Sequence, residues 1–463
     1  MGHFVPHTDE ELARMLAAIG LSTLEQLFDS VPAALRLAGG LDLPDGLSEP
    51  DVLAEIGRLA AANRTGADLI CFAGAGAYDH DVPSATRSLT FRSEFVTAYT
   101  PYQPEVSQGV LQALFEYQTM ISRLSGLPIA NASLYDGASA AVEAVNLAVS
   151  ASRRSTIWVS GGIHPHWRGV LHTYAAGTGH RLVDVPLRHG VTDWSAVADD
   201  GGEAPAALLV SNPNHLGVVE DLRIARRVAD GHGALLLAGF DPVSAALLRS
   251  PGDDGADVAV GEGQPFGTPL SFGGPYLGLF ACTAQQVRRL PGRLVGQTVD
   301  TADRTAYVST LRAREQDIRR EKASSNVCTN QTLIAVAAMI QLSWLGTAGL
   351  RELAVRCARG TRYAREALLA IPSVEPLVDA PTIREFAVRL PVAPADVVER
   401  MAEAGFLAGV PVGLVDGVVT DATGANRGDR TGPGVDGLLV AVTERRTRAE
   451  IDAFAATMEK VVR

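Results

Sequence analysis

Residues Asp257 to Ala281, DVAVGEGQPFGTPLSFGGPYLGLFA, consist of an apolar run, a turn rich in glycine and proline, and a second apolar run. Short apolar runs bounded by such turns are typical of buried strands. The stretch therefore predicts a strand, a glycine loop and a returning strand. Gln264 lies at the start of the predicted loop.

Strand and helix patterns alternate in the residues before this unit. Four apolar runs rich in β-branched and aliphatic residues are separated in places by helical patterns such as Asp221 to Asp230. This alternation is typical of a parallel sheet with crossover helices, so we expect one large α/β domain over residues 61–325. The predicted strands are Thr156 to Val159, Arg181 to Val185, Ala207 to Ser211 and Ala234 to Ala238.

The N-terminal residues have a different pattern. Leu12, Met15 and Ile19 recur at helical spacing after an acidic start. Residues 1–60 are therefore expected to form a helical arm that packs on a neighbour. The other flank, residues 326–463, is expected to form a linker helix and a small C-terminal α/β domain.

Helix and strand patterns alternate again in this C-terminal flank. Thr447 and Glu450 form a capping box that opens the last helix. Residues 301–346 are predicted to be rich in helix, and residues 421–437 to be a polar, glycine-rich loop. The other predicted elements are helices at Leu350 to Leu369 and Ala395 to Glu403, and strands at Glu385 to Leu390 and Gly437 to Val442.

Composition limits the classes of function. The chain has 463 residues, of which 47% are hydrophobic and 20% charged, as in ordinary compact soluble proteins. Its formal charge of −12 argues against a nucleic-acid groove or a contact with anionic membrane, since both need clustered Lys and Arg. The most apolar stretch, Thr332 to Leu345, is too short to cross a bilayer and predicts a buried helix.

Cysteine and histidine spacing predicts no metal site. Four cysteines lie far apart without a C-x-x-C pair, which favours a reduced, cytoplasmic setting, and no signal peptide is expected at the N-terminus. His164 and His166 have a spacing that can bind metal on a strand, but they lack an acidic or cysteine neighbour, so a structural turn is favoured. The cysteines are Cys71, Cys282, Cys328 and Cys357.

Three longer motifs carry a family resemblance. They are the run FVTAYTPYQPEVSQGVLQALFEYQTMISRLSGLPIANASLYDGASAA, the run REKASSNVCTNQ, and the GGP loop at residues 273–275. Together they resemble the glycine-cleavage P-protein, and within it the first subunit of the form that is split into two polypeptides. The resemblance extends from about Phe4 to the C-terminus and implies a pyridoxal phosphate (PLP) transferase fold of the aspartate aminotransferase type, fold type I.

The resemblance places Gln264 where PLP enzymes of this fold carry the Schiff-base lysine. A carboxamide nitrogen is not nucleophilic, so this chain cannot form the internal aldimine there. The run LLLAGFDP likewise puts Ala238 where an acid would face the pyridine nitrogen, with Asp241 three residues on. The only lysines, Lys322 and Lys460, are expected to be solvated helix residues.

The cofactor phosphate of this fold would lie at the start of the helix that begins in NASLYDGASAA. Gly137, Ala138 and Ser139 are small enough for close approach of a phosphate to backbone N–H groups. The alternative is that small residues only allow tight helix packing. Both alternatives stay open from the sequence, and without a lysine any such site would be vestigial.

The resemblance implies a glycine dehydrogenase (decarboxylating) made of two kinds of chain. PLP is expected on the second subunit and not covalently on this chain. Glycine would lose CO2 there, and its aminomethyl group would pass to the lipoyl group of H-protein. No catalytic residue is therefore expected in this chain, whose expected partners are subunit 2, H-protein and glycine.

A loop of this chain is our candidate for completing the partner's pocket, because sites of this fold lie at dimer interfaces. Two prolines stiffen the segment, and it carries two phenols, an amide and a carboxylate. The alternative is a surface loop with structural tyrosines. The candidate residues are Tyr99, Thr100, Tyr102, Gln103 and Glu105.

Two other functions fit the sequence. The first is an autonomous PLP-dependent aminotransferase or decarboxylase that uses Lys322. The second is a scaffold subunit that binds H-protein but contributes nothing to the catalytic pocket. Covalent PLP on the purified chain would favour the first, and variants of the candidate loop that leave the chemistry intact would favour the second.

Overall fold

The computed structural model describes residues 6–37, 41–66, 68–97, 100–197, 203–421 and 437–463. The chain forms two compact units, Met1–Arg64 and Thr65–Arg463. Most of the predicted glycine-rich loop at 421–437 and the candidate residue Tyr99 lie outside the described residues. The three predicted domains, 1–60, 61–325 and 326–463, stay predictions.

The first unit is helical. Its α-helices are α1 (Asp9–Ala18) and α2 (Glu49–Ala60), and 3-10 turns lie at Glu25–Phe28 and Ala33–Leu35. Thr8 caps α1 with a capping box that includes Glu11. Among its described residues only Leu16 is buried, so this unit has almost no core of its own.

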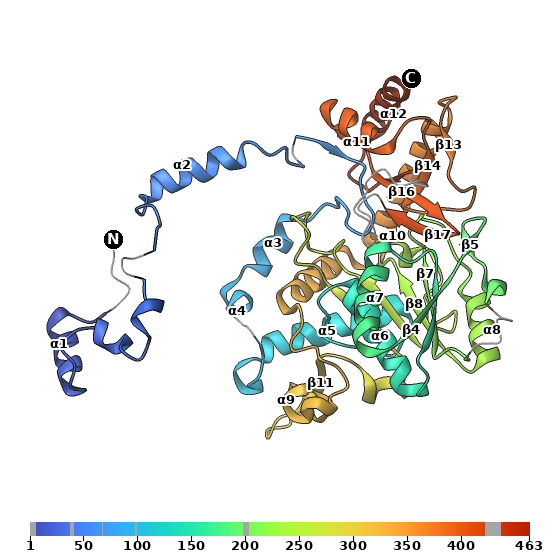
Figure 1. The fold of residues 1–463 in the computed structure, drawn as a ribbon. Helices are drawn as coiled ribbons and strands as arrows, with labels where there is room; N and C mark the ends of the chain where they lie inside the picture. Colours follow the sequence, from blue (N-terminus) through green and yellow to red (C-terminus); the bar gives the residue numbers. More distant parts are fainter. Residues whose placement is uncertain (1–5, 38–40, 67, 98–99, 198–202, 422–436) are drawn as a thin grey trace. The chain divides into compact units, whose positions relative to one another are not determined.

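A seven-stranded sheet forms the centre of the second unit (Figure 1). Five neighbouring strands are parallel, and β10 runs antiparallel to both β9 and β2. The strand order is β2 (Ile129–Ala130), β10 (Gly278–Cys282), β9 (Val258–Glu262), β8 (Leu235–Phe240), β7 (Ala207–Asn212), β3 (Thr156–Ser160) and β4 (Arg181–Val185). The predicted large parallel sheet and the predicted strand–loop–strand unit are thus confirmed.

Helices cover both faces of this sheet because its strands are apolar on both faces. On β3, Ile157 and Val159 pack with α6 (Gly137–Ser152) and α7 (Pro165–Thr178), whereas Trp158 packs with α8 (Leu222–His232). The face that carries Trp158 also holds α5 (Gln108–Ser125) and α10 (Thr332–Leu369), which pack over β8, β9 and β10. Successive residues therefore enter different cores.

A second, antiparallel sheet lies in the C-terminal part. Its order is β13 (Glu375–Pro376), β14 (Glu385–Arg389), β18 (Gly437–Ala441), β16 (Val410–Val415) and β17 (Val418–Asp421). The helices α11 (Pro394–Glu403) and α12 (Arg448–Val462) pack on it through a core that includes Phe386 and Phe454. The predicted capping box of Thr447 with Glu450 is present at the start of α12.

Smaller elements connect these layers. They are α3 (Ser84–Thr90), α4 (Ser93–Val96), α9 (Gln316–Arg319), the pair β1 (Ile70–Cys71) and β15 (Phe406–Leu407), the pair β5 (Leu187–Arg188) and β6 (Val191–Thr192), and 3-10 turns at Pro104–Val106, Trp194–Ala196, Ser244–Ala246, Ala284–Arg289, Arg312–Arg314 and Arg320–Lys322.

One sequence-based prediction needs correction. Residues 301–346 are not simply rich in helix, because β12 (Thr305–Thr310) pairs antiparallel with β11 (Leu294–Val299) in a hairpin. The helices predicted at 332–345 and 350–369 are both present as the two parts of α10, which meet at a kink where Gly346 has a non-helical φ of 60°.

Helix α10 is long and apolar enough to cross a membrane by length and composition. It is the one such helix among the described residues, and 44% of its most apolar window is buried inside the protein. Ala335, Val336 and Ala338 belong to the core that it shares with α5. This packing fits the predicted buried helix.

Candidate functional site

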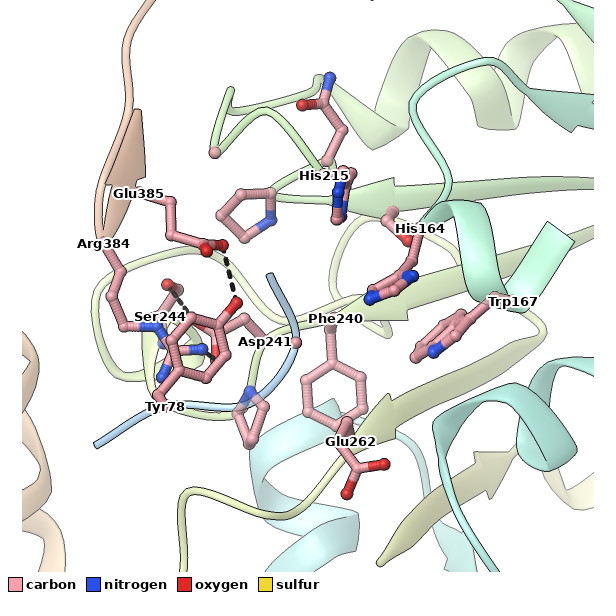
Figure 2. Close-up of a pocket in the computed structure, with 16 residues that line it drawn as sticks. Tyr78, His164, Trp167, His215, Phe240, Asp241, Ser244, Glu262, Arg384 and Glu385 are labelled. Carbon is pink, nitrogen blue, oxygen red and sulfur yellow. Dashed lines mark hydrogen bonds and ion pairs between the residues drawn. The ribbon is translucent and has the colours of Figure 1, made fainter. Parts of the chain in front are cut away.

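A small cavity lies where the parallel strands end. Three strands end at this edge of the sheet: β7 at Asn212, β8 at Phe240 and β9 at Glu262. Open α/β sheets bind their ligands at the carboxyl ends of their strands. The cavity has a volume of about 90 Å³, the share of about three water molecules. Figure 2 shows the residues that line it, which are Gly76, Tyr78, His164, Trp167, Ser211, Pro213, Asn214, His215, Gly217, Phe240, Asp241, Pro242, Ser244, Glu262, Arg384 and Glu385.

Gln264 is completely buried and does not line this cavity. Its Nε2 donates to the carbonyl oxygens of Tyr78, at 3.0 Å, and Thr268, at 2.9 Å. Its Oε1 accepts from the backbone N–H of Tyr78 at 2.9 Å. The carboxamide therefore joins the glycine loop to a segment far away in the sequence, and both amide N–H donors are used.

The N-terminus of α6 is closed by protein groups. Gly137 N donates to Glu262 Oε2 at 2.9 Å, and Ser139 N donates to the N-cap residue Asp136 at 2.7 Å. A Cβ atom at Gly137 would lie 2.2 Å from the indole of Trp167, so that ring lies directly against the helix start. Two of the three N–H groups that would hold a phosphate in this fold, those of Gly137 and Ser139, thus already have acceptors.

The Glu262 carboxyl accepts backbone N–H groups from the start of α6 and from the glycine loop. In addition to Gly137 N, the backbone N–H groups of Gln264 and Leu277 donate to its Oε1, at 3.0 and 2.9 Å. Burial raises the pKa of Glu262 to about 8, although these three donors act to lower it. The sequence shows Glu262 only as a polar residue at the end of an apolar run, so we did not predict this role.

An apolar residue stands at the position where the resemblance would place an acid facing the pyridine nitrogen. Ala238 is completely buried in the core between the sheet and α8. The nearby carboxylate, Asp241, accepts from Arg384 Nη2 at 2.7 Å and from Ser244 Oγ at 2.5 Å. Asp241 is therefore paired inside the protein.

A buried polar network forms one wall of the cavity. Tyr78 Oη donates to Glu385 Oε2 at 2.7 Å, and the Arg384 guanidinium lies 3.5 Å from the centroid of the Tyr78 ring (Figure 2). Burial raises the pKa of Glu385 and raises that of Tyr78 well above its ordinary value. Burial acts to lower the pKa of Arg384, but the charge of Asp241 raises it. The one buried cation of this wall is thus neutralised in place.

His164 is a structural N-cap of α7. Its Nδ1 accepts from His166 N at 3.0 Å, and its Nε2 lies 2.8 Å from the carbonyl oxygen of Ala75, to which it donates. Its ring lies near the ring of His215, with 4.6 Å between centroids. Both ring nitrogens of His164 are used in this arrangement, which agrees with a turn rather than a metal pair.

The positions that hold PLP in this fold do not fit the cofactor in this chain. They offer no amine at position 264, no acid at Ala238 and no open N–H group at Gly137. The cavity wall also carries no unpaired cation for a phosphate dianion, since Arg384 bonds Asp241. Ala138 is buried at the start of α6, and Ser139 N is used by the N-cap residue Asp136.

The candidate loop for a shared site lies around a different residue, Arg293. Its Nη1 donates to Thr100 Oγ1 at 3.1 Å and to Thr329 Oγ1 at 3.2 Å. Its guanidinium lies 5.3 Å from the centroid of the Tyr102 ring. Arg293 is 7% exposed, whereas Tyr102 is 60% exposed. No sequence signal pointed to Arg293, because its neighbours come from distant segments.

Gln103 is the N-cap residue of the 3-10 turn Pro104–Val106, which includes Glu105, and both side chains are exposed. A crevice of about 10 Å³ next to Arg293 is lined by Thr100, Pro101, Tyr102, Arg293, Ser309, Arg312 and Glu315. None of these lines the cavity at the strand ends. Thr100 and Tyr102 therefore contact Arg293 at a surface separate from that cavity, and Gln103 and Glu105 follow them in the chain.

Comparisons with known proteins agree with this architecture. Residues 2–391 match the family described as glycine cleavage system P-protein. Proteins named probable glycine dehydrogenase (decarboxylating) subunit 1 are 47% identical in Moorella thermoacetica, over 99% of both chains, and 45% identical in Prosthecochloris aestuarii, over 98% of this chain and 99% of that one.

Solved structures give the same result at the level of the fold. A crystal structure of glycine decarboxylase (P-protein) of the glycine cleavage system, in inhibitor-bound form, is 42% identical with a TM-score of 0.87 over 99% of this chain and 100% of that one. A NifS-like protein from Rickettsia africae shares the fold at 12% identity, with a TM-score of 0.59 over 85% of this chain and 99% of that one.

Glu262→Gln tests the role of the buried carboxyl. Folding raises its pKa from 4.5 to about 8, so the folded chain holds a proton that the unfolded chain releases. Stability from this group is complete below about pH 4.5 and is lost as the pH rises through about 8. The wild-type melting temperature should fall more steeply than that of E262Q between about pH 5 and 8, and the two profiles should run parallel at higher pH. An exposed-residue control, Glu399→Gln on α11, should follow the wild type; parallel profiles for E262Q and wild type over the lower pH range as well would contradict the assignment.

Gln264→Lys tests the misfit to PLP. Because Glu262 and Trp167 still close the start of α6, Q264K should form no aldimine when PLP is added, as measured by visible absorption before and after borohydride reduction. Circular dichroism checks that the variant folds, and PLP should not saturably quench the tryptophan fluorescence of the wild-type chain. A stoichiometric, borohydride-reducible adduct at position 264, or saturable quenching, would show that the cavity accepts PLP after all.

Proposed function

This chain belongs to the glycine cleavage system P-protein family, and from this premise we propose that it is the cofactor-free subunit of a glycine dehydrogenase (decarboxylating) whose PLP is carried by a second subunit. The observation that carries the proposal is the pairing of Gln264 with Tyr78 and Thr268 at the Schiff-base position. A chain built in this way needs a partner that supplies the amine.

The proposed reaction assigns separate roles to the two chains. PLP on the partner would draw electrons from glycine as CO2 leaves, and the aminomethyl group would pass to lipoyl H-protein. This chain would position the partner's pocket and exclude water from its edge. Its own cavity of about 90 Å³ would contribute no bond-making group.

The surface around Arg293 is our candidate for the shared edge. A buried guanidinium holds Thr100 through a hydrogen bond and Tyr102 through its ring face, so the loop needs little further ordering on binding. The Tyr102 side chain is mostly exposed, with its hydroxyl available as donor or acceptor. We propose that Thr100, Tyr102, Gln103 and Glu105, with Tyr99, meet the partner's pocket.

The N-terminal unit supports a hetero-oligomer. Val52, Leu53, Ile56 and Leu59 form an apolar stripe at helical spacing on α2, and each is at least 42% exposed. A helix that exposes such a stripe is stable only when another surface covers it. We propose that α2 packs on the second subunit.

The rival enzymatic proposal is weaker. Lys322 and Lys460 are exposed and neither lines the cavity at the strand ends, so an autonomous PLP enzyme has no placed amine. The scaffold alternative differs from our proposal in one respect: in it, the surface around Arg293 contributes nothing to the partner's catalytic pocket. A cytoplasmic setting agrees with Cys71, Cys282, Cys328 and Cys357, all of which are free thiols.

Reconstitution tests the separate roles that we propose for the two chains. Glycine–bicarbonate exchange, assayed with H-protein, should be absent with this chain alone and should appear when it is coexpressed with subunit 2. Only the pair contains both the amine that binds PLP and the surface of this chain that we propose completes the pocket. Exchange by this chain alone would favour the autonomous enzyme. Full exchange by subunit 2 alone would show that this chain is dispensable.

Tyr102→Ala tests the shared edge against the scaffold alternative. In the reconstituted enzyme it should lower kcat/KM for glycine by at least about tenfold, equivalent to roughly 1.4 kcal/mol of transition-state stabilisation. Tyr174→Ala, an equally drastic change at an exposed tyrosine on α7, is the control and should leave kcat/KM unchanged. Equal activity of the Tyr102 and Tyr174 variants, with association intact, would support a scaffold instead.

Ile56→Asp tests the arm. A charge in the centre of the α2 stripe should weaken association with subunit 2 by at least about tenfold, since burying an unpaired carboxylate is costly. Arg58→Ala on the same helix changes an exposed residue that pairs only locally with Glu55 and is the control. Analytical ultracentrifugation of the mixed chains measures both, and unchanged association of I56D would exclude α2 from the interface.

A further inference from the structure

A groove rich in arginine lies between α10 and the start of α12, and we propose that it binds a small phosphorylated molecule. Its volume is about 440 Å³, within the range of ordinary small-molecule sites. None of its residues lines either the cavity at the strand ends or the crevice at Arg293. The lining residues are Arg356, Arg359, Gly360, Tyr363, Glu444, Arg446, Arg448 and Ile451.

Two walls direct guanidinium groups into this groove. Arg356 and Arg359 stand three residues apart on α10, so they share one face of that helix. Arg446 and Arg448 face them from the loop before α12 and from its first turn. Planar guanidinium forks that converge from two sides are suited to the several acceptor oxygens of a phosphate.

The charges of the groove are not fully balanced from within. Four arginines line it, against one carboxylate, Glu444; outside the lining, Arg446 meets Asp79 at 3.2 Å and Arg448 meets Asp452 at 3.9 Å. Arg356 pairs with Glu352 at 2.8 Å outside the lining, whereas Arg359 is exposed and makes no hydrogen bond or ion pair within the described ranges. Such a concentration of cations is notable in a chain with a formal charge of −12.

Arg446 supplies an independent sign of an incomplete site. Its side chain is only 5% exposed, yet its Nε has no hydrogen-bond partner among the described residues. The neighbouring carboxylates, Asp79 at 3.2 Å and Glu450 at 3.9 Å, leave the donors of this buried cation partly unused. A bound anion would provide a further hydrogen-bond acceptor for this guanidinium without a change of fold.

The groove also touches the buried network of the cavity. Glu444 Oε2 lies 2.6 Å from His80 Nδ1, and Arg384 Nη1 donates to His80 Nε2 at 2.7 Å. Arg384 in turn holds Asp241. A ligand beside Glu444 would therefore lock residues that join the antiparallel sheet to the end of β8, so binding should stabilise the chain.

The shape of the site favours a small phosphate compound over a polymer. The arginines surround one groove and do not form a track along the surface, as a nucleic-acid strand would require. Tyr363 adds an aromatic face, and its hydroxyl donates to Asp452 at 2.6 Å. The Arg448 guanidinium lies 5.1 Å from the centroid of this ring, and its Nε donates to the Tyr363 hydroxyl at 3.1 Å. Tyr363 therefore positions Arg448 at the groove, and its partly exposed ring lines the groove as an apolar surface.

Calorimetric titration of the purified full-length chain with inorganic pyrophosphate tests the proposal, at physiological ionic strength so that isolated surface charges are screened. Wild-type protein should bind one equivalent saturably, and inorganic phosphate should compete. Arg359→Ala should weaken binding at least tenfold. Arg362→Ala is the matched control, because Arg362 lies on the same helix, is exposed, pairs with Glu366 and does not line the groove; its affinity should equal that of the wild type.

Three outcomes would overturn the proposal. The first is the absence of saturable binding by the wild-type chain. The second is equal loss of affinity in R359A and R362A, which would show attraction to surface charge in general. The third is equal or tighter binding of citrate than of pyrophosphate, which would assign the groove to carboxylates. A rise in melting temperature with pyrophosphate in wild type and R362A, but not in R359A, would support the site by a second measurement.

Discussion

The structure depends on the hydrogen bonds made by two polar side chains beside the ends of the parallel strands, the carboxamide of Gln264 and the carboxyl of Glu262. Gln264 bonds the backbone of Tyr78 and Thr268, and Glu262 accepts three backbone N–H groups at the start of α6. Unpaired polar groups are costly in such an interior, so each partner holds the other in place. Positions that serve a cofactor in PLP enzymes of this fold here join distant parts of one chain.

The chain has the architecture of a PLP enzyme, but its own side chains occupy the positions that serve the cofactor in that fold. Trp167 and Glu262 fill the space beside Gly137, and Asp241 neutralises Arg384, so the sheet edge is closed by packing and pairing. What remains is a cavity of about 90 Å³. The surfaces that we propose act on other molecules lie elsewhere, around Arg293, on the apolar stripe of α2 and in the arginine groove between α10 and α12.

The sequence predicted what depends on local pattern. Apolar runs marked β3, β4, β7 and β8 closely, and Thr447 with Glu450 marked the start of α12, because periodicity and capping are local. The hairpin of β11 and β12 was missed, since its strands are only partly buried and stabilise each other by pairing.

The site was only partly accessible from the sequence. Gln264 and Ala238 stood out because a resemblance assigned chemistry to their positions, and the absence of that chemistry was visible. Glu262, Trp167 and Arg293 gave no such signal, because their roles come from partners that only the fold brings near. The same holds for the arginine groove, which joins residues 356–363 to residues 444–451.

The most direct measurement of the central claim is to locate the cofactor in the assembled enzyme. The complex of this chain with subunit 2 is reduced with borohydride, and the phosphopyridoxyl group is mapped by peptide mass spectrometry. Our account predicts the group on one lysine of subunit 2 and none on this chain. Stoichiometric labelling of Lys322 or Lys460 would contradict it.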